Sequence, residues 1–173
     1  MTALALLLVM MSACDQAPPP DTLKIGGAFP PLVLSGLDGS RLALDDYRGK
    51  LVILNIWATW CAPCRTELPS LDRLAAQLDE RRFVVIGLSV DSDRDIAREY
   101  LLDQGIHLRS YIDPEQKISR DILGVRVYPD SLLISPGGKL LRRFVGARRW
   151  DEPRMIQALR QAATGSMNLL NKF

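Results

Sequence analysis

Histidine and cysteine are scarce in this chain of 173 residues. It contains one histidine, His107, and three cysteines, of which Cys61 and Cys64 lie two residues apart. A structural zinc site needs four such ligands. The two that remain, Cys14 and His107, lie far apart in the sequence. The scarcity therefore argues against a zinc site, and we expect neither a metal nor a cofactor.

The sequence also lacks internal repeats, a strong charge imbalance and a long apolar run. The formal net charge is +2, which gives no reason to expect nucleic acid as a partner. Residues 4–11 are apolar throughout, but a transmembrane helix needs about 20 such residues. The length suits one domain with a moderate hydrophobic core.

The cysteine pair follows a buried-strand pattern, residues 51–56, and precedes a helix-like segment, residues 65–78. A Cys-x-x-Cys motif between a strand and a helix indicates thiol-disulfide redox chemistry. The free N–H groups and positive dipole end of the helix would stabilise a thiolate at Cys61, lower its pKa and make it the attacking sulfur. Cys64 would be more buried and act second. A purely structural disulfide is the alternative, but so small a loop contributes little chain entropy.

Residues 54–69 read Leu-Asn-Ile-Trp-Ala-Thr-Trp-Cys-Ala-Pro-Cys-Arg-Thr-Glu-Leu-Pro. This run, which includes Trp60 and Pro63, resembles the thioredoxin superfamily and, within it, the membrane-anchored TlpA/ResA branch of thiol-disulfide oxidoreductases. The resemblance covers roughly residues 26–163. It implies a thioredoxin-like, three-layer α/β/α fold with an N-terminal β-hairpin extension and a central αβ insertion.

The amino-terminal residues predict export and a lipid anchor. The apolar run of residues 4–11 has the length of a signal-peptide h-region, so residues 1–13 are predicted to be a lipoprotein-type signal peptide. The run Met11-Ser-Ala-Cys14 resembles a bacterial lipobox, which would make Cys14 an acylated first residue. Asp15 resembles a signal that retains such lipoproteins at the inner membrane. We expect a lipid-anchored, proline-rich linker over residues 14–24, a domain over 25–164 and a tail over 165–173. An ordinary secretory signal with a free Cys14 is the alternative.

Besides Trp60 and Pro63, three further residues are predicted to support the cysteine pair: Glu67, Tyr128 and Pro129. Asn55 stands where many thioredoxins carry a buried aspartate that accepts a proton, so Glu67 is the substitute candidate, either tuning the thiols or serving only as a first-turn helix acid. Pro129 matches the cis-proline that faces the cysteines in the superfamily. The backbone of Tyr128 would pair with an extended client chain.

The remaining pattern predicts the elements around the site. It indicates a hairpin around Asp38-Gly39, a second buried strand, and a last helix capped by Asp151. Asp113-Pro114 would open a helix that Gly124 closes. The other predicted strands are residues 106–112, 132–134 and 139–145.

These features predict an exported, membrane-tethered dithiol that reduces disulfides in client proteins at the periplasmic face of the bacterial inner membrane. Similar proteins serve apocytochrome c or copper-site assembly proteins, and a membrane electron donor would re-reduce the pair. An oxidant that forms disulfides is the alternative. A thiol peroxidase and a non-catalytic adaptor lipoprotein are weaker alternatives.

Overall fold

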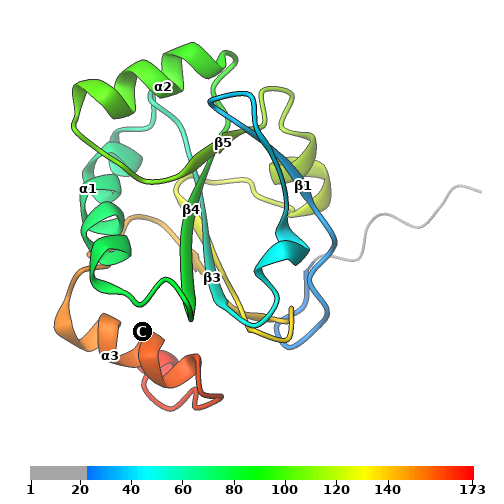
Figure 1. The fold of residues 1–173 in the computed structure, drawn as a ribbon, viewed down its shortest axis with the longest axis vertical. Helices are drawn as coiled ribbons and strands as arrows, with labels where there is room; N and C mark the ends of the chain where they lie inside the picture. The colour runs from blue at the N-terminus through cyan, green and yellow to red at the C-terminus, as the bar shows by residue number, and fades with distance from the viewer. Residues whose placement is uncertain (1–22) are drawn as a thin grey trace, which may run out of the picture.

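The computed structural model describes residues 23–173, which form a mixed β-sheet with helices packed against it (Figure 1). The predicted signal peptide, Cys14 and most of the linker lie outside the described residues. The strands are β1 (Val33–Gly36), β2 (Arg41–Ala43), β3 (Leu51–Trp57), β4 (Phe83–Ser89), β5 (Ser110–Ile112), β6 (Asp130–Ile134) and β7 (Leu140–Val145). The helices are α1 (Ala62–Gln77), α2 (Arg94–Asp103) and α3 (Pro153–Ala162), with short turns of helix at η1 (Leu44–Tyr47), η2 (Lys117–Ile122) and η3 (Leu170–Lys172).

The seven strands lie in the order β2-β1-β5-β4-β3-β6-β7. Strands β3 and β4 run parallel and are joined through α1, whereas β6 runs antiparallel to β3. All seven residues of β3 are buried, as expected for a central strand covered on both faces. The end of β3, the end of β4 and the start of β6 therefore lie side by side at the same end of the strands, where the cysteine loop begins.

The predicted additions to the thioredoxin-like fold are confirmed. Strands β1 and β2 form the N-terminal hairpin, and Gly39 adopts a positive φ of 86° in its turn, a conformation that glycine adopts without a steric penalty. The central insertion contributes β5, which lies between β1 and β4 in the sheet. None of the helices formed by residues 23–173 has both the length and the apolar character needed to cross a membrane.

The helix predicted to start at Asp113-Pro114 is wrong in its start and its type. Helical structure begins only at Lys117, as the short π-helix η2. Gln116 has a positive φ of 56°, which no right-handed helix can include. The Asp113 side chain accepts hydrogen bonds from the N–H groups of Ile118 and Ser119. Asp113 therefore caps a later turn than its position beside Pro114 suggests.

The capping role predicted for Asp151 is also wrong. Helix α3 starts at Pro153 with Glu152 as its N-cap residue. The Asp151 carboxylate instead pairs with Arg73 of α1, with 2.8 Å between Oδ2 and Nε. After α3 the chain packs back on the domain, and Leu170, within the predicted tail, is fully buried.

Strand β7 forms one edge of the sheet and carries two adjacent arginines. The Arg142 guanidinium lies 5.3 Å from the centre of the Phe144 ring. Arg143 forms an ion pair with the buried Asp130 and donates hydrogen bonds to the carbonyl groups of Leu123 and Gly124. These residues hold the outer strand to the insertion and to the start of β6.

Gly87 provides a test of packing in the centre of the sheet. A Cβ atom there would lie 2.7 Å from the Trp57 Nε1 atom and 2.7 Å from the Ser110 Oγ atom. We expect Gly87→Ala to lower the free energy of unfolding by about 1–3 kcal/mol, the usual cost of overpacking. Urea unfolding measures this loss. The control is Gly137→Ala, whose added Cβ would meet only Ser135 Oγ at 3.8 Å; equal stability of the two variants would contradict the prediction.

Candidate active site

Cys61 and Cys64 form a disulfide at the amino end of α1. Cys61 is the N-cap residue, and its sulfur accepts a hydrogen bond from the Cys64 N–H group at 3.2 Å. Pro63 lies in the first turn, where an N–H group has no acceptor within the helix, so its missing donor costs nothing. Cys61 is 7% exposed and Cys64 is fully buried. Cys61 is thus the sulfur that a partner can reach first, although its catalytic role stays a prediction.

An aromatic pair lies beside the disulfide. The ring centres of Trp60 and Tyr128 are 5.7 Å apart in an edge-to-face arrangement, and the Trp60 side chain is 62% exposed. The Tyr128–Pro129 peptide bond is cis. Because Asp130 pairs with Ile56 of β3, the antiparallel register brings Pro129 to the edge of the sheet where the cysteine loop starts.

Glu67 lies on the inner face of α1 and is 2% exposed. Its Oε1 atom accepts hydrogen bonds from the Trp150 indole at 2.6 Å and from the Arg148 N–H group at 3.0 Å. Its Oε2 atom accepts one from the Asn55 amide at 3.0 Å. The alternative that Glu67 is a first-turn helix acid is wrong, because α1 has no acidic residue in its first turn. Glu67 is instead a buried carboxylate whose oxygens are met by hydrogen-bond donors.

Burial raises the pKa of Glu67 above its ordinary value, and the hydrogen bonds from Trp150, Arg148 and Asn55 oppose that rise. The Asn55 amide nitrogen also donates to Ser131 Oγ at 2.8 Å. Asn55 thus links the helix that carries the cysteines to strands β3 and β6. Asn55 donates a hydrogen bond to Glu67. Its amide is not a base, so it cannot take over the proton-accepting role of an aspartate.

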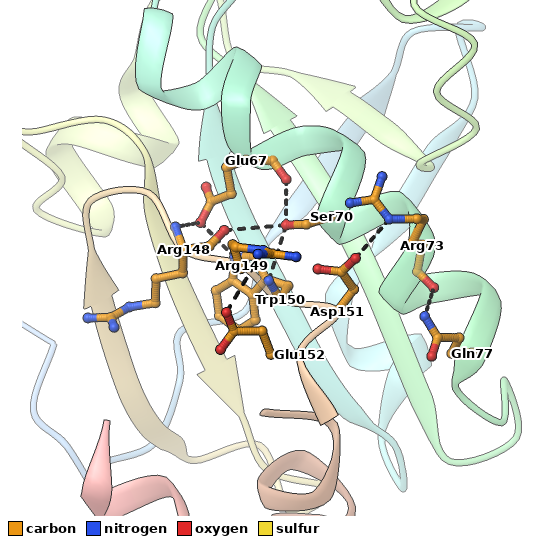
Figure 2. Close-up of polar contacts among 9 residues, drawn as sticks. All are labelled: Glu67, Ser70, Arg73, Gln77, Arg148, Arg149, Trp150, Asp151 and Glu152. Carbon is orange, nitrogen blue, oxygen red and sulfur yellow. Dashed lines mark hydrogen bonds and ion pairs between the residues drawn. The ribbon is translucent and has the colours of Figure 1, made fainter. Parts of the chain in front are cut away.

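The loop between β7 and α3 is fastened to α1 by a second set of contacts (Figure 2). The Ser70 hydroxyl donates to the Glu67 carbonyl at 2.8 Å and accepts from the Trp150 N–H group at 3.1 Å. The Trp150 ring packs edge-on against Phe144, with 5.3 Å between centres. The loop therefore presents its indole and N–H donors to Glu67 in a fixed position.

A second buried carboxylate, Asp91, lies at the same edge of the sheet. Asp91 follows β4 and is 2% exposed. It accepts hydrogen bonds from the N–H group and hydroxyl of Thr59 and from the hydroxyl of Ser89. Thr59 belongs to the loop that leads from β3 to Cys61, so Asp91 is hydrogen-bonded to the cysteine loop.

Sequence reasoning missed Trp150, Arg148 and Asp91. The first two lie more than 80 positions from Glu67, and no local pattern links them to it. A sequence pattern could have indicated Asp91. It follows a buried strand that runs parallel to β3, so it lies near the end of β3 where the cysteine loop begins. Within residues 23–173, no group of three or more His, Cys, Asp or Glu residues is placed to hold a metal ion.

A thioredoxin-like sheet with a disulfide across a helix start and a cis-proline at the same edge defines a thioredoxin-fold redox protein. Residues 25–143 match the AhpC/TSA family, and the chain belongs to that family. It is similar to thiol-disulfide oxidoreductase ResA of Bacillus thuringiensis strain Al Hakam, with 32% identity over 132 residues, which are 76% of each chain. It is 26% identical to ResA of Bacillus subtilis over 126 residues, 73% of this chain and 70% of that one.

Solved structures agree with this assignment. A protein from Chlorobium tepidum assigned as thiol:disulfide interchange protein DsbE is 30% identical, with a TM-score of 0.73 over 82% of this chain and 99% of that one. The exposed lipoprotein thioredoxin of Streptococcus pneumoniae is 26% identical, with a TM-score of 0.65 over 79% of this chain and all of that one. The chain is a thiol-disulfide oxidoreductase of the ResA/DsbE type.

The raised pKa of Glu67 predicts a pH dependence of stability. Below its ordinary value of 4.5, the carboxyl is protonated in both the folded and the unfolded chain and burial carries no charge penalty. As the pH rises through the folded-state pKa, the buried group ionises at a cost that the unfolded chain does not bear. The carboxyl therefore destabilises the fold increasingly from about pH 4.5 upward.

Glu67→Gln cannot titrate, so it isolates this effect. We expect the unfolding free energy of the wild type minus that of Glu67→Gln to fall as the pH rises from about 4.5 towards neutral, with a slope no steeper than about 1.4 kcal/mol per pH unit. Urea unfolding at a series of pH values measures the difference. A difference that rises with pH would mean that the hydrogen bonds outweigh burial.

Proposed function

We propose that the chain is an exported, membrane-tethered dithiol that reduces disulfides in client proteins. The observation that carries the proposal is the disulfide at the start of α1, in which Cys61 is slightly exposed and Cys64 is fully buried. In the reduced chain, the Cys61 thiolate attacks a client disulfide, forms a mixed disulfide and releases one client thiolate. The Cys64 thiolate then attacks the Cys61 sulfur and releases the second client thiolate. Two electrons pass to the client, whose two thiolates take up protons.

Buried Cys64 must lose a proton before it attacks, and apolar surroundings favour its neutral thiol. Glu67 lies three residues further along the same helix, on the same buried face, with a pKa raised by burial. A carboxylate with a raised pKa is a suitable proton acceptor near neutral pH. Glu67 therefore takes the role that the aspartate replaced by Asn55 plays in other thioredoxins.

The reducing direction is supported by the small number of groups placed near Cys61 that would stabilise a thiolate. A strong oxidant arises when the reduced form is greatly stabilised. Within residues 23–173, one hydrogen bond reaches the Cys61 sulfur, and Ala62 and Pro63 between the cysteines carry no charge. Client chains would contact Trp60 and the backbone of Tyr128. Clients with cysteine pairs, such as apocytochrome c or copper-site assembly proteins, and a membrane electron donor are the partners that we propose.

The reduction potential of the Cys61–Cys64 pair tests the direction. We expect a value near or below about −230 mV, close to thioredoxin, because few groups in residues 23–173 are placed to stabilise a Cys61 thiolate. The full chain is equilibrated with thiol buffers, and Trp57 and Trp60 report oxidation by fluorescence. The Cys64→Ser variant, which cannot form the pair, is the control for signals unrelated to it. A value near about −120 mV would make the chain an oxidant instead.

The proposed anchor is tested at Cys14 and Asp15. When the chain is expressed in a Gram-negative host, we expect it in the inner-membrane fraction, with acyl chains on Cys14 detected by mass spectrometry. Cys14→Ser should abolish acylation, because the thiol that receives the lipid is missing. Asp15→Ser should keep acylation and move the chain to another membrane. An unmodified Cys14 in a soluble wild-type chain would contradict the lipoprotein assignment and favour an ordinary secretory signal.

A further inference from the structure

Asp91 is a buried acid whose position matches no step of the reaction described above. Its Oδ1 atom accepts the Thr59 hydroxyl at 2.7 Å, and its Oδ2 atom accepts the Ser89 hydroxyl at 2.7 Å. The Thr59 N–H group lies 3.2 Å and 3.1 Å from the two oxygens. All of these donors are neutral, and no cation pairs with Asp91 among residues 23–173. Burying a carboxylate on neutral donors costs free energy that an apolar residue would not cost.

The sheet register explains why Asp91 meets Thr59. Trp57 of β3 pairs with Ser89 of β4, and the Val90 N–H group donates to the Trp57 carbonyl at 2.9 Å. Thr59 and Asp91 each lie two residues beyond that last pair. The two chains leave the sheet side by side, and the carboxylate links them after the ladder has ended.

The segment to which Asp91 is hydrogen-bonded is the turn that leads into Cys61 and α1. The Cys61 N–H group donates to the Ala58 carbonyl at 3.2 Å, so Thr59 and Trp60 are the two central residues of a four-residue turn. The Cys61 sulfur then accepts the Cys64 N–H group. Asp91 is therefore bonded to a central residue of the turn that the Cys61 N–H group closes.

We propose that Asp91 is a positioning residue for the thiol-disulfide reaction. By holding Thr59 through both its N–H group and its hydroxyl, it fixes the turn so that the Cys61 sulfur stays at the helix terminus, where a thiolate is stabilised. The same turn holds Trp60 against Tyr128. This inference rests on the proposed function, but it concerns the reactivity of Cys61 and not the direction of electron flow.

The test is the rate at which iodoacetamide alkylates Cys61 in the reduced full chain near neutral pH, with peptide mass spectrometry to separate Cys61 from Cys64 and Cys14. We expect Asp91→Ala to slow alkylation by about fivefold, as the sulfur loses its fixed place at the helix terminus. Removing a negative charge near a thiolate would by itself speed alkylation. The sign of the change therefore separates positioning from a simple charge effect.

Asp113→Ala is the matched control. Asp113 is 4% exposed and likewise accepts backbone N–H groups, but its carboxylate bonds to η2 and not to the turn. We expect both variants to lose stability in urea, and only Asp91→Ala to slow alkylation of Cys61. Equal slowing in both variants would show that loss of stability, and not position, controls the rate.

Thr59→Val keeps the charge of Asp91 and removes only the hydroxyl donor, so it serves even if Asp91→Ala does not fold. We expect alkylation about twofold slower in Thr59→Val and restored in Thr59→Ser. Unchanged or faster alkylation in both Asp91→Ala and Thr59→Val would overturn the proposal. Because alkylation needs no client, a wild-type potential typical of an oxidant would refute the proposed direction and leave this result intact.

Discussion

A carboxylate placed on the buried face of the redox helix must be met by donors, and this demand ties the distant parts of the chain together. Glu67 receives its donors from β3 through Asn55 and from the loop after β7 through Arg148 and Trp150. Each donor fixes the segment that carries it, because a buried carboxylate that loses a partner becomes costly. The start of α1, which carries the cysteines, is thereby fixed relative to the central strand β3 and to the loop after β7.

Two buried carboxylates lie near the cysteine pair, one on α1 and one at the end of β4. Glu67 lies after Cys64 on α1 and is suited to exchange a proton, since burial favours its neutral form. Asp91 accepts hydrogen bonds from the N–H group and the hydroxyl of Thr59, in the turn before Cys61. Under the two proposals, proton transfer and geometry fall to different residues, so each could vary without the other.

The sequence predicted the parts of the fold that rest on local patterns. Residues 51–57 are apolar except for Asn55, a pattern that indicates a central strand, and Cys-x-x-Cys before a helical segment indicates the redox turn. Other parts depend on partners far along the chain. In the sequence, Trp150 cannot be told from an ordinary core aromatic, because its bond to Glu67 forms only when the loop packs on α1. Asp151 has the sequence position of a helix cap, but its carboxylate pairs with Arg73. The local sequence also predicted the wrong start for the helix after Pro114, because Gln116 adopts a positive φ, which glutamine rarely does.

The arginines of β7 have a consequence for the behaviour of the chain among its copies. An outer strand with free N–H and C=O groups invites another strand to pair with it and begin aggregation. Here the start of that strand is already bonded to residues 26–28, and the strand carries Arg142. The opposite outer strand, β2, is three residues long and starts with Arg41. Adding a strand at either side would bring like charges from two molecules together. Both borders of the sheet are thereby protected against self-association at high local concentration.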